Sequence, residues 1–324
     1  MYRSTFLLKA YKMIFAYNQV KARPKLLLAM TGLTQGEFDQ LLLHFQHAWD
    51  QFVRQNYMDR ANRQRQYGGG RSEATLVTLE DKLLFILYYV KVYPLQEVLA
   101  FEFGMVQSTA HEWIHLLSAV LKQALDHGGY VPERDAKQLG TILASEAEST
   151  YGIDGTERLR QRPHDPEKQK YYYSGKKKAH TLKNLVIGGL HTRKVNYLSQ
   201  TYEGKRHDKK IADEENPTFP QDSSLYKDTG FQGYEPQGVQ TFQPQKKPRG
   251  QELTPEQRTQ NTLISKVRIV IEHIISGIKR CRIVKDLFRN TKEMYDDLVM
   301  EIACGLHNFR VEYRHSETPN SYSR

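Results

Sequence analysis

The sequence predicts an all-α N-terminal region followed by an α/β domain. Up to residue 126 the apolar residues recur at the three- and four-residue spacing of amphipathic helices. From residue 149 onward, short runs rich in β-branched and aromatic residues alternate with helical segments. A third observation, a formal net charge of +10, indicates an anionic partner for the chain.

Residues 1–57 are expected to be helical. Thr34 with Glu37 three residues later has the pattern of a capping box. The apolar residues that follow at helical spacing are Phe38, Leu41, Leu42, Phe45 and Trp49. Residues 58–75 are rich in Arg, Gln and Gly and predict a basic flexible linker.

Residues 76–130 are interpreted as a helix-turn-helix DNA-binding domain. Thr78 would cap its first helix, Gly104 would end the second, and Ser108 would cap the third. In this motif the start of the last helix contacts base edges. The DNA-binding candidates there are Gln107, Thr109, His111 and His115. A small helical bundle without DNA-binding function has the same capped-helix pattern.

The element order after residue 145 predicts one α/β domain over residues 145–315. Strands are expected over 151–154, 171–175, 182–190 and 194–202, and a further strand should end at Asp228. Helices are expected over 207–214, 255–280 and 292–313, with a loop over 235–254. This order fits a ribonuclease-H-like domain with an acidic cluster at one edge of its central sheet.

Three acidic residues lie at separate elements of this domain. Asp154 and Asp228 each follow a β-like run and precede a glycine turn, and Glu272 lies on a basic amphipathic helix. Carboxylates from separate elements can converge on Mg²⁺, and a two-metal site clamps both oxygens of a phosphodiester displacement. The alternatives are ordinary Asp-Gly turns and a solvated helix face.

Several ordered motifs resemble the DDE transposases of small bacterial insertion sequences. The similarity extends over roughly residues 25–312. The motifs are Gly152-Ile-Asp-Gly-Thr-Glu157, Tyr173-Ser-Gly-Lys-Lys-Lys178, His180-Thr-Leu-Lys183, His207-Asp208, Asp228-Thr-Gly-Phe-Gln-Gly233, Arg268-Ile-Val-Ile-Glu272 with Lys279, and Leu306-His-Asn-Phe-Arg310. Ser265 stands where the family pattern has tyrosine, a residue that contributes to the handling of flanking DNA.

The resemblance implies that Asp154, Asp228 and Glu272 are the catalytic, metal-binding triad. It further implies two Mg²⁺ ions per site, for which Mn²⁺ substitutes: one between the two aspartates, the other between Asp154 and Glu272. The expected reaction is cleavage and joining of DNA at terminal inverted repeats and a target. Because two ends must be brought together, a homodimer or larger synaptic complex is expected. His180, His207 and Asp208 are either structural or supports for the metal ligands.

Basic residues cluster around the acidic ones. Residues 157–183 carry nine Lys or Arg against three Asp or Glu, and residues 240–290 carry eleven against four. Arg268, Glu272 and Lys279, spaced by four and seven, lie along one helical face, where the two cations can hold a DNA backbone. Lys176 and Lys178 are further candidates for DNA contact, although a charge run is often only solvated. The triple tyrosine 171–173 is expected in the strand core, with stacking on a base as the alternative.

The remaining features indicate an intracellular protein, and the resemblance implies a cytoplasmic, nucleoid-associated bacterial one. The chain contains two cysteines, Cys281 and Cys304, in no metal-ligand spacing, which favours a reducing compartment. The longest apolar run, Leu83 to Val90, is far shorter than a membrane span, and no secretory signal is predicted. Two other functions remain open: a catalytically silent DNA-binding derivative of a transposase, and a DNA nuclease on the same fold.

Overall fold

The computed structural model describes residues 13–58, 75–146, 148–247, 250 and 252–317. The chain divides after Gly128 into two compact units. The predicted linker over 58–75 lies almost wholly outside the described residues. None of the helices in the described part of the chain is long and apolar enough to cross a membrane.

The N-terminal unit is entirely helical. Its elements are α1 (Tyr17–Lys21), α2 (Pro24–Thr31), α3 (Gln35–Val53), a π-helical turn (Arg54–Met58), α4 (Leu79–Val92), α5 (Gln96–Glu102) and α6 (Gln107–His127). Helix α4 is central: every residue from Lys82 to Val90 is buried, as expected for a helix that is apolar all round. Because α2 packs on α4 and α3 on α6, the residues before and after the predicted linker form one unit.

Local capping fixes several of these helix ends. Thr34 and Glu37 form the predicted capping box, and the Thr78 side chain accepts from the Asp81 backbone N–H. Gly104 adopts a positive φ of 67° after α5, which glycine allows without steric cost. The prediction that Ser108 caps α6 was wrong, because the helix already begins at Gln107 and Val106 occupies the N-cap position.

The second unit is built on a mixed sheet. Its strands are β1 (Thr150–Leu159), β2 (Tyr173–Ser174), β3 (Ala179–Gly189), β4 (Val195–Leu198), β5 (Tyr202–Glu203), β6 (Ser223–Lys227) and β7 (Val239–Phe242). The strand order is β2-β3-β1-β6-β7, and β4 and β5 also pair with β3. Strand β1 is antiparallel to β3 and parallel to β6, which is parallel to β7.

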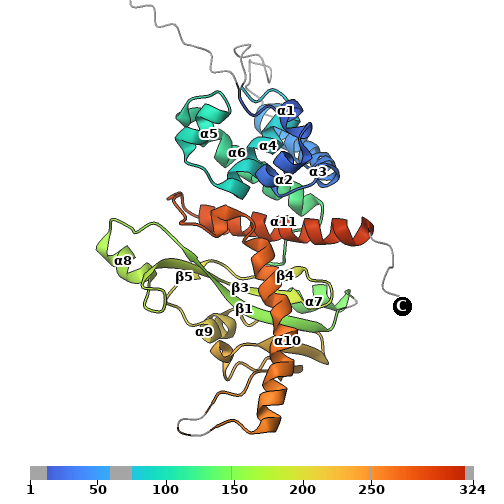
Figure 1. Cartoon of the computed structure of the whole chain (residues 1–324), viewed down its shortest axis with the longest axis vertical. Helices are drawn as coiled ribbons and strands as arrows, with labels where there is room; N and C mark the ends of the chain where they lie inside the picture. Colours follow the sequence, from blue (N-terminus) through green and yellow to red (C-terminus); the bar gives the residue numbers. More distant parts are fainter. Residues whose placement is uncertain (1–12, 59–74, 147, 248–249, 251, 318–324) are drawn as a thin grey trace, which may run out of the picture. The chain divides into compact units, whose positions relative to one another are not determined.

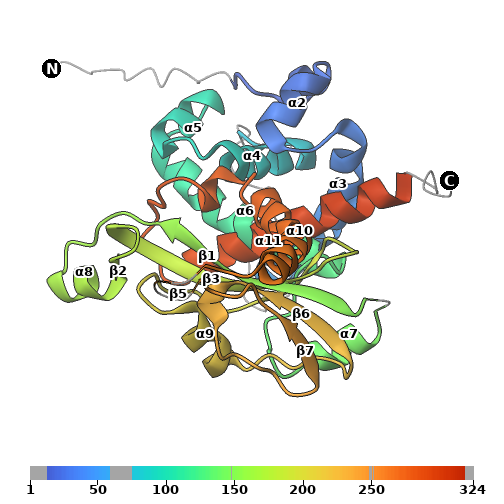
Figure 2. The ribbon, with the colours of Figure 1, turned by 60° about the horizontal axis from the view of Figure 1, so that its bottom comes forward.

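Helices cover both faces of this sheet. On one face α7 (Leu139–Ala144) and α9 (Asp208–Glu215) pack on buried residues of β1, β3 and β6 (Figure 2). On the other face lies α10 (Pro255–Ile278), which crosses β1 in Figure 1. Its Ile271 approaches Gly152 so closely that an added Cβ would lie 2.9 Å from the isoleucine Cβ. The last helix, α11 (Tyr295–Glu317), packs on α10 and β4.

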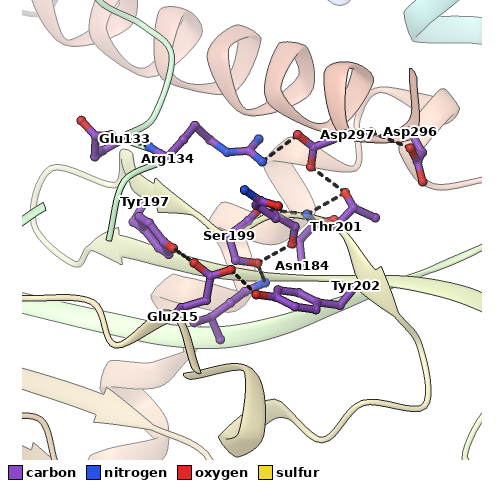
Figure 3. Close-up of polar contacts among 12 residues, drawn as sticks. Glu133, Arg134, Asn184, Tyr197, Ser199, Thr201, Tyr202, Glu215, Asp296 and Asp297 are labelled. Atoms are coloured by element: carbon purple, nitrogen blue, oxygen red, sulfur yellow. Dashed lines mark hydrogen bonds and ion pairs between the residues drawn. The ribbon is translucent and has the colours of Figure 1, made fainter. Parts of the chain in front are cut away.

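A polar network joins α11 and α9 to the strands (Figure 3). Asp297 of α11 accepts hydrogen bonds from Arg134 at 2.7 Å and from Thr201 at 2.8 Å. Glu215 of α9 accepts from the hydroxyls of Tyr197 and Tyr202. Because each of these half-buried carboxylates has two donors, its partial loss of water is compensated.

Four secondary-structure predictions need correction. The predicted strand 194–202 is two short strands, β4 and β5. Residues 171–175 are not one strand: α8 (Pro166–Tyr172) precedes the short β2, since Asp165 caps a helix with Pro166 at its first position. Tyr171 and Tyr173 are therefore exposed rather than in a strand core. The predicted loop 235–254 contains β7, the edge strand next to β6. Strand β1 does not end at Asp154 but continues to Leu159.

Candidate active site and nucleic-acid interface

Two aspartates lie side by side on neighbouring parallel strands. In the register of β1 with β6, Ile153 is opposite Lys227. Asp154 is the next residue of β1, and Asp228 is the residue just after the end of β6. Neighbouring strands are about 4.8 Å apart. The pairing of β1 with β6 stops at this point while β1 continues, so the aspartates occupy the position where the two strands diverge.

The Asp154 carboxylate lies in an environment that disfavours its charge. Burial, followed by the nearby Asp228, raises the pKa of Asp154 to about 6. A hydrogen bond from the Gly155 backbone N–H, at 2.7 Å, and the attraction of Arg268 oppose this rise in pKa. The folded protein therefore disfavours the ionised form of Asp154.

Backbone and side-chain contacts fix the second aspartate. Asp228 Oδ1 accepts from the Gly230 backbone N–H at 2.7 Å, which caps a short 3₁₀ helix, Thr229–Phe231. The preceding Lys227 is fully buried, pairs with Glu235 at 2.7 Å and also donates to the Tyr234 carbonyl. Sequence reasoning missed this lysine, although its place in the Ser223, Leu225, Lys227 alternation put it on the buried face of β6.

Helix α10 carries Glu272 along the sheet face to which Asp154 points. Gly152 and Asp154 share this face because side chains alternate along a strand, and Gly152 contacts Ile271, the residue before Glu272. Glu272 itself is exposed. Arg268 lies close enough to Asp154 to lower its pKa. The pKa of Lys279 is lowered by burial and then by Lys177, while Asp154 acts to raise it.

The three carboxylates are not within mutual coordination distance. Among the described residues, no group of three or more His, Cys, Asp and Glu side chains is close enough to hold a metal ion. The structure brings Asp154 and Asp228 together and places Glu272 on the helix above them. The metal triad therefore stays a prediction.

A third aspartate, Asp208, lies beside the first two. It is the first residue of α9, and its Oδ1 would be 2.5 Å from a Cβ added at Gly155. It also lies near Gly230, and it pairs with buried Lys183 at 3.0 Å. The close approach of Asp208 leaves little room for a side chain at Gly155, while at Gly230 the nearest atom to an added Cβ is Asp228 Oδ1 at 2.8 Å.

A hollow of about 300 Å³ lies next to this group. Asp208 and Asp228 line it together with four cationic side chains: Lys176, Lys183, Lys205 and Arg206. Lys176, a predicted DNA contact, thus reaches the vicinity of the aspartates, whereas Lys178 does not line the hollow and lies exposed in the turn before β3. His207 also lines it, but His180 lies in a separate hollow with Arg162 and Tyr173.

Two family models match the chain. The model described as DDE superfamily endonuclease matches residues 153–308, and that of the helix-turn-helix of DDE superfamily endonuclease matches residues 75–126. The chain belongs to the DDE transposase family. A probable transposase for insertion sequence element IS702 from Microchaete diplosiphon is 24% identical over 233 residues, which cover 72% of this chain and 81% of that protein. No solved structure matches.

The match of the DDE family's helix-turn-helix model spans α4, α5 and α6, which confirms the predicted motif. At the start of α6, Gln107 and His111 are exposed, whereas Thr109 and His115 are half-buried. Gln107 donates to Gln96 of α5 at 2.9 Å, and the His111 and His115 rings meet edge to face with centroids 4.6 Å apart. Gln107 and His111 are thus the predicted contacts most available to DNA.

Proposed function

We propose that this chain is a metal-dependent DNA transposase that cuts and joins DNA at the ends of its own element. The observation that carries the proposal is the parallel register of β1 and β6, which sets Asp154 beside Asp228 under the helix of Glu272. Membership in the DDE family and the similarity to a probable insertion-sequence transposase support it.

The sheet order supports a ribonuclease-H-like fold for the catalytic domain. Strand β3 pairs antiparallel with β4, β5 and β1. The parallel strands β6 and β7 follow on the other side of β1. In this arrangement the first aspartate lies on a central strand and the second at the carboxyl end of its parallel neighbour. Ligands of α/β sheets bind outside the carboxyl ends of such strands.

The donor set suits Mg²⁺, for which Mn²⁺ substitutes. Adjacent Asp154 and Asp228 would hold the ion. Burial and then the nearby Asp228 raise the pKa of Asp154, and a bound cation would favour its ionised form. Glu272 would complete a second position with Asp154. A divalent cation at such a site supplies a Lewis acid for the phosphoryl oxygens and lowers the pKa of a bound water.

The residues around the carboxylates would bind and orient the substrate. Arg268 on α10 and Lys279 at the C-cap of this helix, one on each side of Glu272 in the sequence, would hold the DNA backbone and set the scissile phosphodiester against the aspartates. Lys176 would contact a neighbouring phosphate at the mouth of the hollow beside Asp228. The ion pair with Lys183 would hold the carboxylate of Asp208, which lines the hollow, in a fixed position.

The N-terminal unit would recognise the terminal inverted repeats. Gln107 and His111, exposed at the start of α6, would contact base edges in the major groove. Two ends must meet for transposition, so a homodimer or larger complex is the proposed working form, acting on DNA in the cytoplasm.

The test is a strand-joining assay with the full chain. Labelled duplex ends from the repeats that flank the gene are incubated with Mg²⁺ and a supercoiled target. Joined products that disappear in Asp228→Asn would support the transposase. Cleavage without joining would favour a nuclease on the same fold, and binding without cleavage would favour a silent DNA-binding derivative.

A further inference from the structure

A second cationic cavity lies between α10, α11 and the β3–β4 turn, away from the carboxylates. Its volume is about 300 Å³. On α10 it is lined by His273 and Gly277, and Arg280 lines it just past the end of the helix, whereas Arg268 and Glu272 lie on the catalytic face of α10. Because successive residues of a helix are about 100° apart, the two sets point in different directions from the same helix.

The floor of this cavity comes from the Leu306-His-Asn-Phe-Arg310 motif, which the proposed active site does not use. His307 is buried, and its Nε2 donates to the Arg193 carbonyl at 3.0 Å. Its Nδ1 faces Gly277, where an added Cβ would lie only 2.3 Å away. Buried Arg310 donates to the Gly277 carbonyl at 2.9 Å. The motif therefore holds the His307 imidazole and the Arg310 guanidinium by hydrogen bonds against Gly277, the one α10 position without a side chain.

The fixed position of the motif is reinforced from the sheet. Asn308 accepts from the Val195 backbone N–H at 2.7 Å and donates to the Val195 carbonyl at 2.9 Å. It thus continues the hydrogen bonding of β4 into α11. Burial lowers the pKa of His307 to about 4, so its ring is neutral at pH 7 and serves as a fixed donor and wall.

The rim of the cavity is exposed and strongly cationic. Arg193, Arg280 and Arg314 are exposed around it, and His273 stands beside them. None of the described residues that line it is Asp or Glu. Glu312 of α11 pairs with Lys194 at 2.5 Å.

Planar guanidinium groups with fixed donors match phosphate oxygens in pairs, which makes clustered arginines the usual phosphate receptors. We propose that this cavity binds a phosphate of the DNA backbone, at a contact separate from the catalytic face of α10. The inference rests on the DNA substrate of the proposed function. It gives the transposase a second anchor on its DNA, held by Arg280 and Arg314.

The first test measures binding of a duplex by the full chain between 50 and 200 mM salt. Arg280→Gln/Arg314→Gln removes two rim charges, and Arg282→Gln/Lys285→Gln removes two exposed charges outside the cavity. Loss of one phosphate contact lowers the salt slope by about 0.9, which is about an eightfold loss of affinity at 0.1 M salt. The control pair should keep the wild-type slope. Equal slopes for the two double variants would overturn the proposal.

A second readout is independent of folding defects in the variants. Arginines of the wild type are modified with phenylglyoxal, with and without duplex, and located by mass spectrometry. DNA should protect Arg280 and Arg314 but leave Arg282 reactive, and equal reactivity at all three would contradict the proposal.

The source of the phosphate is decided by titrating inorganic phosphate into wild type and the rim variant. Phosphate binding that the variant loses, with unchanged DNA affinity, would assign the cavity to a small phosphate ligand and overturn the DNA contact. Strand joining is scored separately. If strand joining is normal but the salt slope of the rim variant is unchanged, this inference alone is wrong. If the salt slope is reduced but no joining occurs, the transposase proposal alone is wrong.

Discussion

Replacing Asp154 by asparagine should stabilise the metal-free protein while it abolishes cleavage. The fold raises the pKa of Asp154 from 3.8 to about 6, so the folded state disfavours the ionised form. Asparagine carries no charge and retains an oxygen for the hydrogen bond from the Gly155 N–H. The variant thus keeps the geometry and removes both the cost of burying a charge at this position and the repulsion from Asp228.

The magnitude follows from the shift in pKa. A rise from 3.8 to about 6 corresponds to up to about 3 kcal/mol of unfolding free energy. The sign follows from linkage: the destabilisation is absent below pH 3.8, grows as pH rises to about 6, and is complete above it. The advantage of Asp154→Asn should therefore be about 3 kcal/mol at pH 8 and about half of that at pH 5.

The assay must report on the catalytic unit. Both tryptophans, Trp49 and Trp113, lie in the N-terminal unit, so their fluorescence does not follow it. The stability of the catalytic unit is instead followed by amide hydrogen exchange of peptides from β1 and β3, measured in EDTA across a urea series. Asp213→Asn, an exposed residue paired with Lys209, is the matched control. An Asp154→Asn variant no more stable than wild type at pH 8, or a gain independent of pH, would refute the reasoning.

Three further predictions concern packing, capping and charge. Gly152→Ala should cost about 1–3 kcal/mol of unfolding free energy because its Cβ would lie 2.9 Å from the Ile271 Cβ. The control Gly175→Ala, with open space around it, should not lower the unfolding free energy in this way. Hydrogen exchange of β1 distinguishes the two variants. Thr34→Ala should lose the capping box and about 1 kcal/mol, read by tryptophan fluorescence against exposed Gln40→Ala, and equal stabilities would contradict the cap. Arg268→Gln should reduce the salt slope of DNA binding by about 0.9, and an unchanged slope would remove it from the interface.

Much of the fold is predictable because local signals agree with the tertiary structure. Thr34 and Thr78 mark helix starts through their own hydrogen bonds, and the uninterrupted apolar run from Leu83 to Val90 marks the central helix. The segment 171–173 shows the opposite case. Its aromatic residues favour a strand, but the Asp165 cap and Pro166 upstream decide for a helix.

The candidate site is predictable only in part. Each aspartate has a local signature, a β-like run followed by glycine, but their proximity depends on the register of β1 with β6. Buried Lys227 and the approach of Asp208 to Gly155 arise from tertiary contacts that no local pattern encodes. The arginine cavity combines three distant segments, so sequence spacing alone could not indicate it.

The most direct test of the central claim, that Asp154, Asp228 and Glu272 act as one catalytic unit, is strand cleavage of end DNA in Mg²⁺. Wild type, Asp154→Asn, Asp228→Asn, Glu272→Gln and the control Asp213→Asn are compared, with DNA binding measured in parallel. The account predicts that each of the first three variants binds the ends but does not cut them, while Asp213→Asn cuts like wild type. Wild-type cleavage by any one of the three would contradict it.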